Sequence, residues 1–486
     1  MTEPCELSAV AARRLIGAKK LSPVELLESC VKRIEQVDGS LNAITAIDLT
    51  AARKAARRAE ADVMAGAALD ILHGLPIGVK DLEATAGLRT TKGSLLFKDH
   101  VPASDDLAVA NVRAAGGVIL CKTNVPEFGA GANTKNRVFG ATGNPFDPIK
   151  TCAGSSGGSA VALATNMVPL ATGSDYGGSL RTPAAFCGVV GFRPSPGLVP
   201  SLEKPAALIP WSVLGPMGRT VEDAHLLLCA QIDTDKRDPF SSDDVGRIPE
   251  ALTGIDLSSV RVAFSTDLGC CPVDKQIARV FEAKVKTFRG AFAEAQDRDP
   301  DLGPHIHEVF EVLRGLTMVA SHRERLEKHR DLLGPNVIDN TERGLKYSLA
   351  DVAWAQVEQA KLMKSFMALY DDVDILICPA ASVSPFPHEQ LFVTEINGEK
   401  MPTYMRWLSL SYALTMALPC AVCLPCGVDH LGMPFGIQVV GHNGSDAVVL
   451  EIAFALEQHL AANADTARPL PDLARLSGKG RPKAFA

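Results

Sequence analysis

Two short segments rich in glycine and serine constrain the fold of this chain more than any other feature. They read GSSGGS at residues 154–159 and GSDYGGS at residues 173–179. The first opens an alanine-rich stretch of helical character, and the second follows a short apolar segment typical of a buried strand. Further apolar segments with the character of strands lie at residues 75–79, 118–121, 188–192, 375–379 and 435–441. Glycine-rich turns between such strands and helices predict an α/β layered fold.

The order of these patterns favours one large domain that spans residues 1–486. A helical N-terminal segment is expected over 1–70, where Ser22 and Pro23 form a helix start. No internal repeat or low-complexity linker divides the rest. Within the domain we expect a catalytic core over 71–200, a helical layer over 272–374 and a return to the sheet over 375–460.

Composition and charge exclude several classes of protein. The 486 residues are 47% hydrophobic and 22% charged, as in a globular chain that buries a large core. The net charge is −7 and no lysine- or arginine-rich block is present, so we expect no nucleic-acid partner. The longest apolar stretch, residues 413–428, is interrupted by Pro419 and Pro425 and is too short to cross a membrane. Because no apolar run of signal-peptide length opens the sequence, we expect a cytoplasmic protein.

The twelve cysteines are scattered and mostly flanked by apolar or small residues, which is typical of buried free thiols. The spacing of Cys420, Cys423 and Cys426 resembles part of an iron–sulfur binding run. A cluster held by four thiolates needs a fourth ligand, and no cysteine follows Cys426. The same segment has the character of a buried strand. We therefore interpret it as core and expect neither a metal nor an organic cofactor.

Ser179 is the best candidate for a nucleophile. It follows Gly177 and Gly178 and precedes a short segment of helical character. Glycine permits sharp backbone bends, so successive N–H groups can point at one spot, as they do at the start of a helix. The backbone N–H groups of Tyr176, Gly177, Gly178 and Ser179 are therefore expected to form an oxyanion hole.

A serine hydroxyl needs a base that takes its proton. None of the eleven histidines lies beside either cluster. Lys80, which follows the apolar segment at 75–79, is the alternative base, since burial or neighbouring positive charge can lower the pKa of a lysine. Ser155, in the first cluster, is suited to pass a proton from Ser179 to Lys80.

Several motifs together carry a resemblance to a known family. They are GLPIGVKD at 74–81, KTNVPEF at 122–128, GSSGGS at 154–159, DYGGSLR at 175–181, GVVGFRP at 188–194 and GMPFGIQ at 432–438. In these stretches the chain resembles the amidase signature family of serine hydrolases. The resemblance implies a large mixed, twisted β-sheet covered by helices on both faces. It also implies hydrolysis of a carboxylic amide to an acid and an amine or ammonia.

The same resemblance implies a Ser–cis-Ser–Lys triad. Ser179 matches the acylated serine, Ser155 the bridging serine and Lys80 the base. The peptide bond before Ser155 would then be cis. Ser156 is expected to support the site by hydrogen bonding.

Neighbouring residues are also assigned roles. Asp175 and Arg181 are expected to form an ion pair that fixes the glycine-rich turn. Tyr176 replaces a threonine that is more common in the family, but its backbone N–H remains available as a donor. Gly129 is a candidate substrate contact. The walls of the substrate pocket are expected from residues 129–146, 205–214 and 382–407.

Other functions fit parts of the pattern. The first cluster satisfies the G-x-S-x-G motif of α/β-hydrolases with Ser156 as nucleophile, but residues 144–150 contain two prolines where that motif needs a strand. A glutamine-hydrolysing component of a tRNA-dependent amidotransferase would carry the same triad and act with partner proteins. The middle of this chain lacks the NLARYDG stretch associated with that subfamily. A non-enzymatic binding protein would be expected to have lost a triad residue, and none is lost.

The leading interpretation is therefore a stand-alone amidase that acts on a small-molecule amide. Esters, anilides and carbamates present the same carbonyl geometry, so side activity on them is expected. A homodimer is the expected oligomeric state on the basis of the family resemblance.

Overall fold

An eleven-stranded mixed sheet runs through the protein in the order β1-β3-β2-β6-β8-β7-β14-β15-β11-β9-β10. The computed structural model describes residues 3–241 and 248–478. The strands of the sheet are β1 (Ile44–Ile47), β2 (Pro76–Lys80), β3 (Val118–Thr123), β6 (Leu170–Asp175), β7 (Val190–Arg193), β8 (Val213–Gly218), β9 (Arg261–Phe264), β10 (Glu294–Asp297), β11 (Ile375–Pro379), β14 (Cys420–Val428) and β15 (Pro434–Gly441). Two short strand pairs lie apart from it, β4 (Lys135–Asn136) with β5 (Gly140–Ala141) and β12 (Glu395–Ile396) with β13 (Glu399–Lys400).

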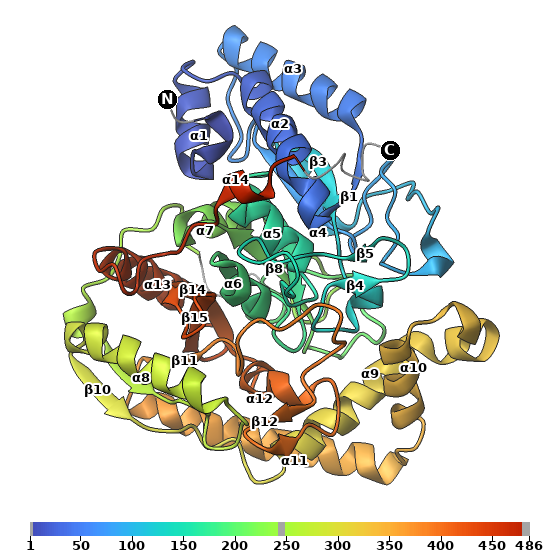
Figure 1. Cartoon of the computed structure of the whole chain (residues 1–486), viewed down its shortest axis with the longest axis vertical. Coiled ribbons are helices and arrows are strands. Elements are labelled where there is room, and N and C mark those ends of the chain that lie inside the picture. Colours follow the sequence, from blue (N-terminus) through green and yellow to red (C-terminus); the bar gives the residue numbers. More distant parts are fainter. Residues whose placement is uncertain (1–2, 242–247, 479–486) are drawn as a thin grey trace.

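Helices surround the sheet (Figure 1), with α1 to α3 gathered at the top of the view and α9 to α11 at the bottom. The α-helices are α1 (Ala9–Gly17), α2 (Pro23–Leu41), α3 (Leu49–Ala65), α4 (Leu107–Ala114), α5 (Gly157–Ala164), α6 (Arg181–Cys187), α7 (Val221–Gln231), α8 (Lys275–Phe288), α9 (Ile306–His329), α10 (Pro335–Gly344), α11 (Leu349–Met367), α12 (Ser409–Met416), α13 (Asp446–Ala461) and α14 (Leu473–Leu476). In the described part of the chain, none of these helices is long and apolar enough to cross a bilayer.

Both faces of the sheet are covered. The strands β2, β3, β11 and β15 are buried at every residue, whereas a sheet with one wet face would alternate buried and exposed side chains. Pairing occurs in both directions, since β2 is parallel to β3 and β6 while β14 is antiparallel to β7 and β15. The expected mixed sheet with helices on both faces is confirmed.

The helix start expected at Ser22 is present at the beginning of α2. The Ser22 hydroxyl accepts a hydrogen bond from the Val24 N–H at 2.9 Å, and the Glu25 carboxylate accepts one from the Ser22 N–H at 3.1 Å. This reciprocal capping box satisfies backbone donors that have no partner inside the helix. Pro23 occupies the first helical position, where its missing N–H costs nothing.

Two strands of the sheet carry no clear sequence signal. The region 272–374 contains α8 to α11, as expected, but also β10, which pairs in parallel with β9. The four residues of β10 are exposed or half-buried, so no apolar alternation marks them. The strand β8 reads VLGPMG, a poor strand sequence, yet it lies between β6 and β7. A Cβ on Gly215 would stand 2.4 Å from the Phe192 carbonyl oxygen, so this close packing requires glycine.

The three cysteines with metal-like spacing lie on β14. Side chains alternate between the two faces of a strand, so Cys423 points away from Cys420 and Cys426. Accordingly, Cys423 belongs to one hydrophobic core and the other two belong to another. Burial raises the pKa of the Cys426 thiol to about 12. Across residues 3–241 and 248–478, no group of three or more histidine, cysteine, aspartate or glutamate side chains is arranged to hold a metal ion.

Candidate active site

Lys80 and the second serine cluster meet because β2 and β6 are neighbouring parallel strands. Gly78 of β2 pairs with Ala171 of β6, so the two strands end at the same edge of the sheet. Lys80 is the last residue of β2, and its backbone N–H donates to the Thr172 hydroxyl of β6 at 3.0 Å. Such an edge, at the carboxyl ends of parallel strands, is where α/β proteins commonly bind ligands.

The first serine cluster is held at this edge by the start of α5. A Cβ on Gly158 would stand 2.3 Å from the backbone nitrogen of Asn124, so the close approach of the helix requires glycine there. Ser155 and Ser156 directly precede the helix. The Gly154–Ser155 peptide bond is cis, which confirms the expectation drawn from the family resemblance.

The Lys80 ammonium nitrogen lies among serine oxygens. Its Nζ donates to the hydroxyls of Ser155, Ser156 and Ser174, each at 2.8 Å, and to the Ser174 carbonyl at 3.4 Å. None of these partners is a carboxylate. Lys80 is 0% exposed and Ser155 is 3% exposed, so the contacts form away from bulk water.

Burial lowers the pKa of Lys80 from its ordinary 10.5 to about 7, because an ammonium group loses its hydration when it is buried. The negative charges of Glu83 and Asp175 raise the pKa but do not offset the effect of burial. Near neutral pH a substantial part of Lys80 is therefore an uncharged amine. The lone pair of that amine can accept a proton from a serine hydroxyl.

Asp175, the last residue of β6, anchors the glycine-rich turn that follows it. Its carboxylate accepts hydrogen bonds from Arg181 at 2.9 and 3.0 Å and from Arg193 at 3.3 Å, and all three side chains are fully buried. It also accepts from the backbone N–H groups of Gly178 at 3.0 Å and Leu180 at 3.1 Å. Burial alone would raise the pKa of Asp175, but the two guanidinium charges and these hydrogen bonds hold it well below its ordinary value.

The turn leaves three of the four expected oxyanion donors free. Gly178, which the sequence predicted to face the oxyanion, donates its N–H to Asp175 instead. The N–H groups of Tyr176, Gly177 and Ser179 have no hydrogen-bond partner among the described residues. Free N–H groups that converge on one turn are suited to bind an anionic oxygen.

A backbone hydrogen bond joins the two serine clusters. The Ser156 N–H donates to the Ser179 carbonyl at 3.3 Å. The Ser179 side chain is half-buried, and its hydroxyl makes no hydrogen bond to any residue that the structure describes. Ser179 is thus held beside the lysine–serine group with its hydroxyl unengaged.

The Tyr176 side chain points away from this chemistry and packs against α9. Its hydroxyl is hydrogen bonded to the Thr317 hydroxyl at 3.3 Å. The Arg314 guanidinium lies 4.8 Å from the centre of its ring, and the Phe310 ring makes an edge contact at 6.1 Å. The Tyr176 side chain therefore connects the glycine-rich turn to α9 of the helical layer.

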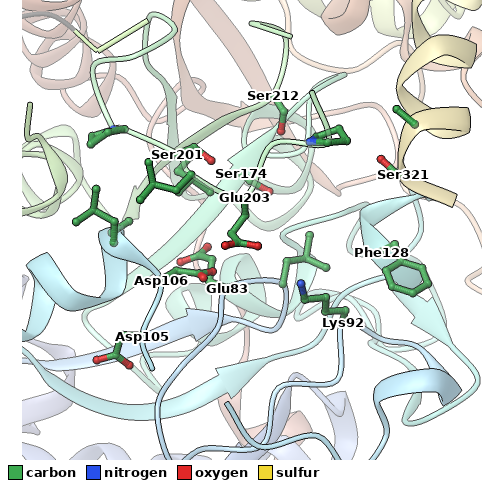
Figure 2. A pocket seen from close by; sticks show the side chains of 18 of the residues that line it. Glu83, Lys92, Asp105, Asp106, Phe128, Ser174, Ser201, Glu203, Ser212 and Ser321 are labelled. Carbon is green, nitrogen blue, oxygen red and sulfur yellow. The ribbon is translucent and has the colours of Figure 1, made fainter. Parts of the chain in front are cut away.

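A cavity of about 520 Å³ opens next to the lysine–serine group. Ser174, whose hydroxyl binds Lys80, lies in its wall, as do Leu82 and Phe128 (Figure 2). The segment 205–214 contributes to the wall as expected, through Pro205, Ser212 and Leu214.

The rest of the expected pocket wall differs from the observed one. No residue of the expected segments 129–146 and 382–407 lines this cavity. Residues within 82–92, 104–108, 200–203 and 320–325 contribute instead. Gly129 is absent from the lining, but it stands beside the triad, since a Cβ on it would lie 3.3 Å from the Ser155 hydroxyl oxygen.

The structure places two further residues at the site, and no motif in the sequence predicts a role for either of them. Ser174 is the third hydroxyl around Lys80, and Glu83 lies in the cavity wall with its side chain 3% exposed. The sequence shows that Ser174 precedes Asp175, but it does not show the contact of Ser174 with Lys80, because that contact depends on the register of β2 against β6. Glu83 lies three residues after Lys80, which by itself indicates no direction for its side chain.

Comparison with known proteins identifies the family. The family model described as Amidase matches residues 25–450, so the chain belongs to the amidase family. The chain is 30% identical to an acylamidase of Rhodococcus erythropolis over 469 residues, which cover 96% of each protein. It is 33% identical to a glutamyl-tRNA(Gln) amidotransferase subunit of Thermus thermophilus over 487 aligned residues, 92% of this chain and 96% of that protein.

Solved structures agree with this assignment. A bacterial aryl acylamidase of the amidase signature family superposes with a TM-score of 0.85 at 27% identity, covering 96% of this chain and 99% of that one. Together these findings confirm the predicted family, fold and reaction class. The chain is a hydrolase that acts on the carbon–nitrogen bond of amides.

The buried charge network at Asp175 leads to a stability prediction. Asp175→Asn leaves the buried Arg181 and Arg193 without a negative partner, and breaking a buried ion pair in this way typically costs about 3–5 kcal/mol. Chemical denaturation should show a loss of that size. Asp339→Asn is the control, since its pair with Arg343 is half-exposed and should contribute at most about 1 kcal/mol. Equal stability of the two variants would contradict the anchoring role of Asp175.

Proposed function

We propose that this amidase cleaves a small-molecule carboxylic amide through an acyl-enzyme on Ser179, with Ser155 as proton relay and Lys80 as base. The proposal is carried by the hydrogen bond of 2.8 Å between the buried Lys80 amine and the Ser155 hydroxyl. This hydrogen-bonded pair lies beside the turn that carries Ser179, so the proposed nucleophile, relay and base lie at one edge of the sheet.

In the first step the Ser179 oxygen attacks the carbonyl carbon of the amide. The Ser179 proton moves to Ser155, whose own proton moves to the neutral Lys80 amine. Ser156 and Ser174 accept hydrogen bonds from Nζ at 2.8 Å, so they hold the amine in place while its charge changes. An ammonium with three N–H groups matches the three surrounding hydroxyls, which favours the charged state that this step creates.

The carbonyl oxygen gains negative charge as the tetrahedral intermediate forms. The free N–H groups of Tyr176, Gly177 and Ser179 are the proposed donors to that oxyanion. The loss of one such donor typically costs on the order of 3 kcal/mol of transition-state stabilisation. The Gly178 N–H keeps the turn in shape through Asp175.

The intermediate collapses when the leaving nitrogen receives a proton. Lys80 returns its proton through Ser155, so the carbon–nitrogen bond breaks and a neutral amine or ammonia departs. Water then attacks the acyl-enzyme, and the same relay takes its proton and returns it to the Ser179 oxygen. The cycle releases the acid and restores neutral Lys80.

The amidotransferase interpretation deserves one direct test, because a protein of that class is among the relatives. We expect the isolated chain to hydrolyse simple aliphatic or aryl amides without any partner protein. Liquid chromatography of the released amine or ammonia measures this activity. Glutamine hydrolysis that appears only when partner proteins are added would contradict the stand-alone assignment. A homodimer stays a prediction for this chain.

The pH dependence of kcat/KM tests the lysine base. Only neutral Lys80 can accept a proton, and burial lowers its pKa to about 7. The rate should therefore be level above about pH 8 and fall roughly tenfold for each unit of pH well below 7. If the base were an exposed lysine, kcat/KM would already fall below about pH 10, because that is the ordinary pKa range of lysine. A rate that stays constant down to strongly acidic pH would exclude a lysine base.

A further inference from the structure

One wall of the cavity is acidic. Figure 2 shows the carboxylates of Glu83, Asp106 and Glu203 gathered about the same part of the cavity, near Ser174. Burial is the main reason that the pKa values of Glu83 and Asp106 are raised; the charge of Asp106 adds to the effect on Glu83, and the charge of Glu203 adds to the effect on Asp106. A fourth acid in the lining, Asp105, has both carboxylate oxygens engaged by other residues of the protein.

The Glu83 carboxylate is buried without a hydrogen-bond partner. Its side chain is 3% exposed, and neither oxygen is hydrogen bonded to any residue described in the structure. Burial raises the pKa of Glu83 to about 7, although the charges of Lys122 and Lys80 and the nearby Thr172 hydroxyl lower it. An unpaired buried carboxylate costs free energy in the free enzyme, so its presence in a cavity wall points to a ligand that pairs with it.

Among the described residues, no lysine or arginine side chain forms an ion pair or hydrogen bond with the carboxylates of Glu83, Asp106 or Glu203. Lys92 lines the cavity (Figure 2) and its charge lowers the pKa of Asp106, but no contact of that kind joins it to the three acids. Lys122 is buried nearby, but its Nζ donates to the Glu83 carbonyl and to the Thr85 hydroxyl at 2.8 Å, not to the carboxylate. Arg325, also in the cavity lining, donates to the Ser321 carbonyl and to His322. Within the described ranges, no cluster suited to a metal ion includes these acids. The acidic wall of the cavity is therefore suited to bind an organic cation.

We infer that the cavity selects amides that carry an ammonium group, which Glu83 binds together with Asp106 and Glu203 while the amide carbonyl reaches Ser179. The inference rests on the proposed role of Ser179 in amide hydrolysis. Pairing with an ammonium group satisfies the Glu83 carboxylate and relieves the repulsion among the three acids. The substrate class is thus amides of amino-substituted acids or of diamines.

Matched substrates test the inference. On the acyl side, kcat/KM is measured at pH 8 for the p-nitroanilides of 5-aminopentanoic, hexanoic and adipic acid, whose chains differ only at the far end. On the amine side, the N-acetyl amides of 1,4-diaminobutane and pentylamine form the equivalent pair. Shorter and longer members of each set cover other distances from the acids to Ser179. The ammonium compound should exceed its neutral match by about tenfold or more in at least one set, and the carboxylate compound should be the poorest.

Variants connect the preference to the acidic wall. The readout is the ratio of kcat/KM for the ammonium and neutral compounds, because effects of Glu83 on Lys80 act on both and cancel. Glu83→Gln and Glu203→Gln should each lower that ratio, and the exposed position of Glu203 makes its variant safe for folding. Glu399→Gln, an exposed acid on β13 outside the cavity lining, should leave the ratio unchanged.

The results distinguish a failure of the cationic subsite from a failure of the proposed amide hydrolysis on Ser179. Equal rates on ammonium and neutral compounds in every set, or a ratio that neither variant lowers, would overturn the cationic subsite while leaving amide hydrolysis intact. Hydrolysis that persists in Ser179→Ala would overturn the proposed function itself.

Discussion

The arrangement of the site depends first on the burial of the Lys80 side-chain amine. A lysine that is 0% exposed and has only serine hydroxyls and a carbonyl as hydrogen-bond partners loses the hydration of its charged form, and its pKa falls to about 7. A carboxylate in ion-pair contact would stabilise the charge and remove the base. In the proposed mechanism the surrounding hydroxyls therefore hold the amine beside Ser155 without stabilising its charge as a carboxylate would.

The polar groups around Lys80 are arranged so that no carboxylate of the described residues forms an ion pair with its amine. Asp175 lies at the end of the neighbouring strand, but its negative charge is matched by Arg181 and Arg193. The Asp175 carboxylate fixes the turn by accepting the Gly178 N–H, while the N–H groups of Tyr176, Gly177 and Ser179, the proposed oxyanion donors, have no partner among the described residues. Lys80 is buried without a carboxylate partner in the described part of the chain, whereas Asp175 is buried and fully paired, so the proposed base and the anchor of the turn lie at the ends of neighbouring strands.

The sequence predicted the parts of the site that depend on short motifs. Lys80 and the two serine clusters could be predicted as site residues because few other functions combine glycine, serine and lysine in this pattern. Contacts that depend on strand register, such as Ser174 against Lys80, were not visible, since register is set by packing across the sheet. The same limit applies to Glu83 and to β10, where no apolar periodicity marks the element. The cavity wall from α9 was also missed, because residues far apart in sequence meet there.

We propose that Ser179, and not a serine of the first cluster, forms the covalent bond with the substrate. The most direct measurement is mass spectrometry of peptides after the enzyme reacts with a phosphonate that labels activated serines. We expect a single adduct on the peptide that contains Ser179, and none on that peptide in Ser179→Ala. An adduct on Ser156, the serine of the G-x-S-x-G motif, would contradict it.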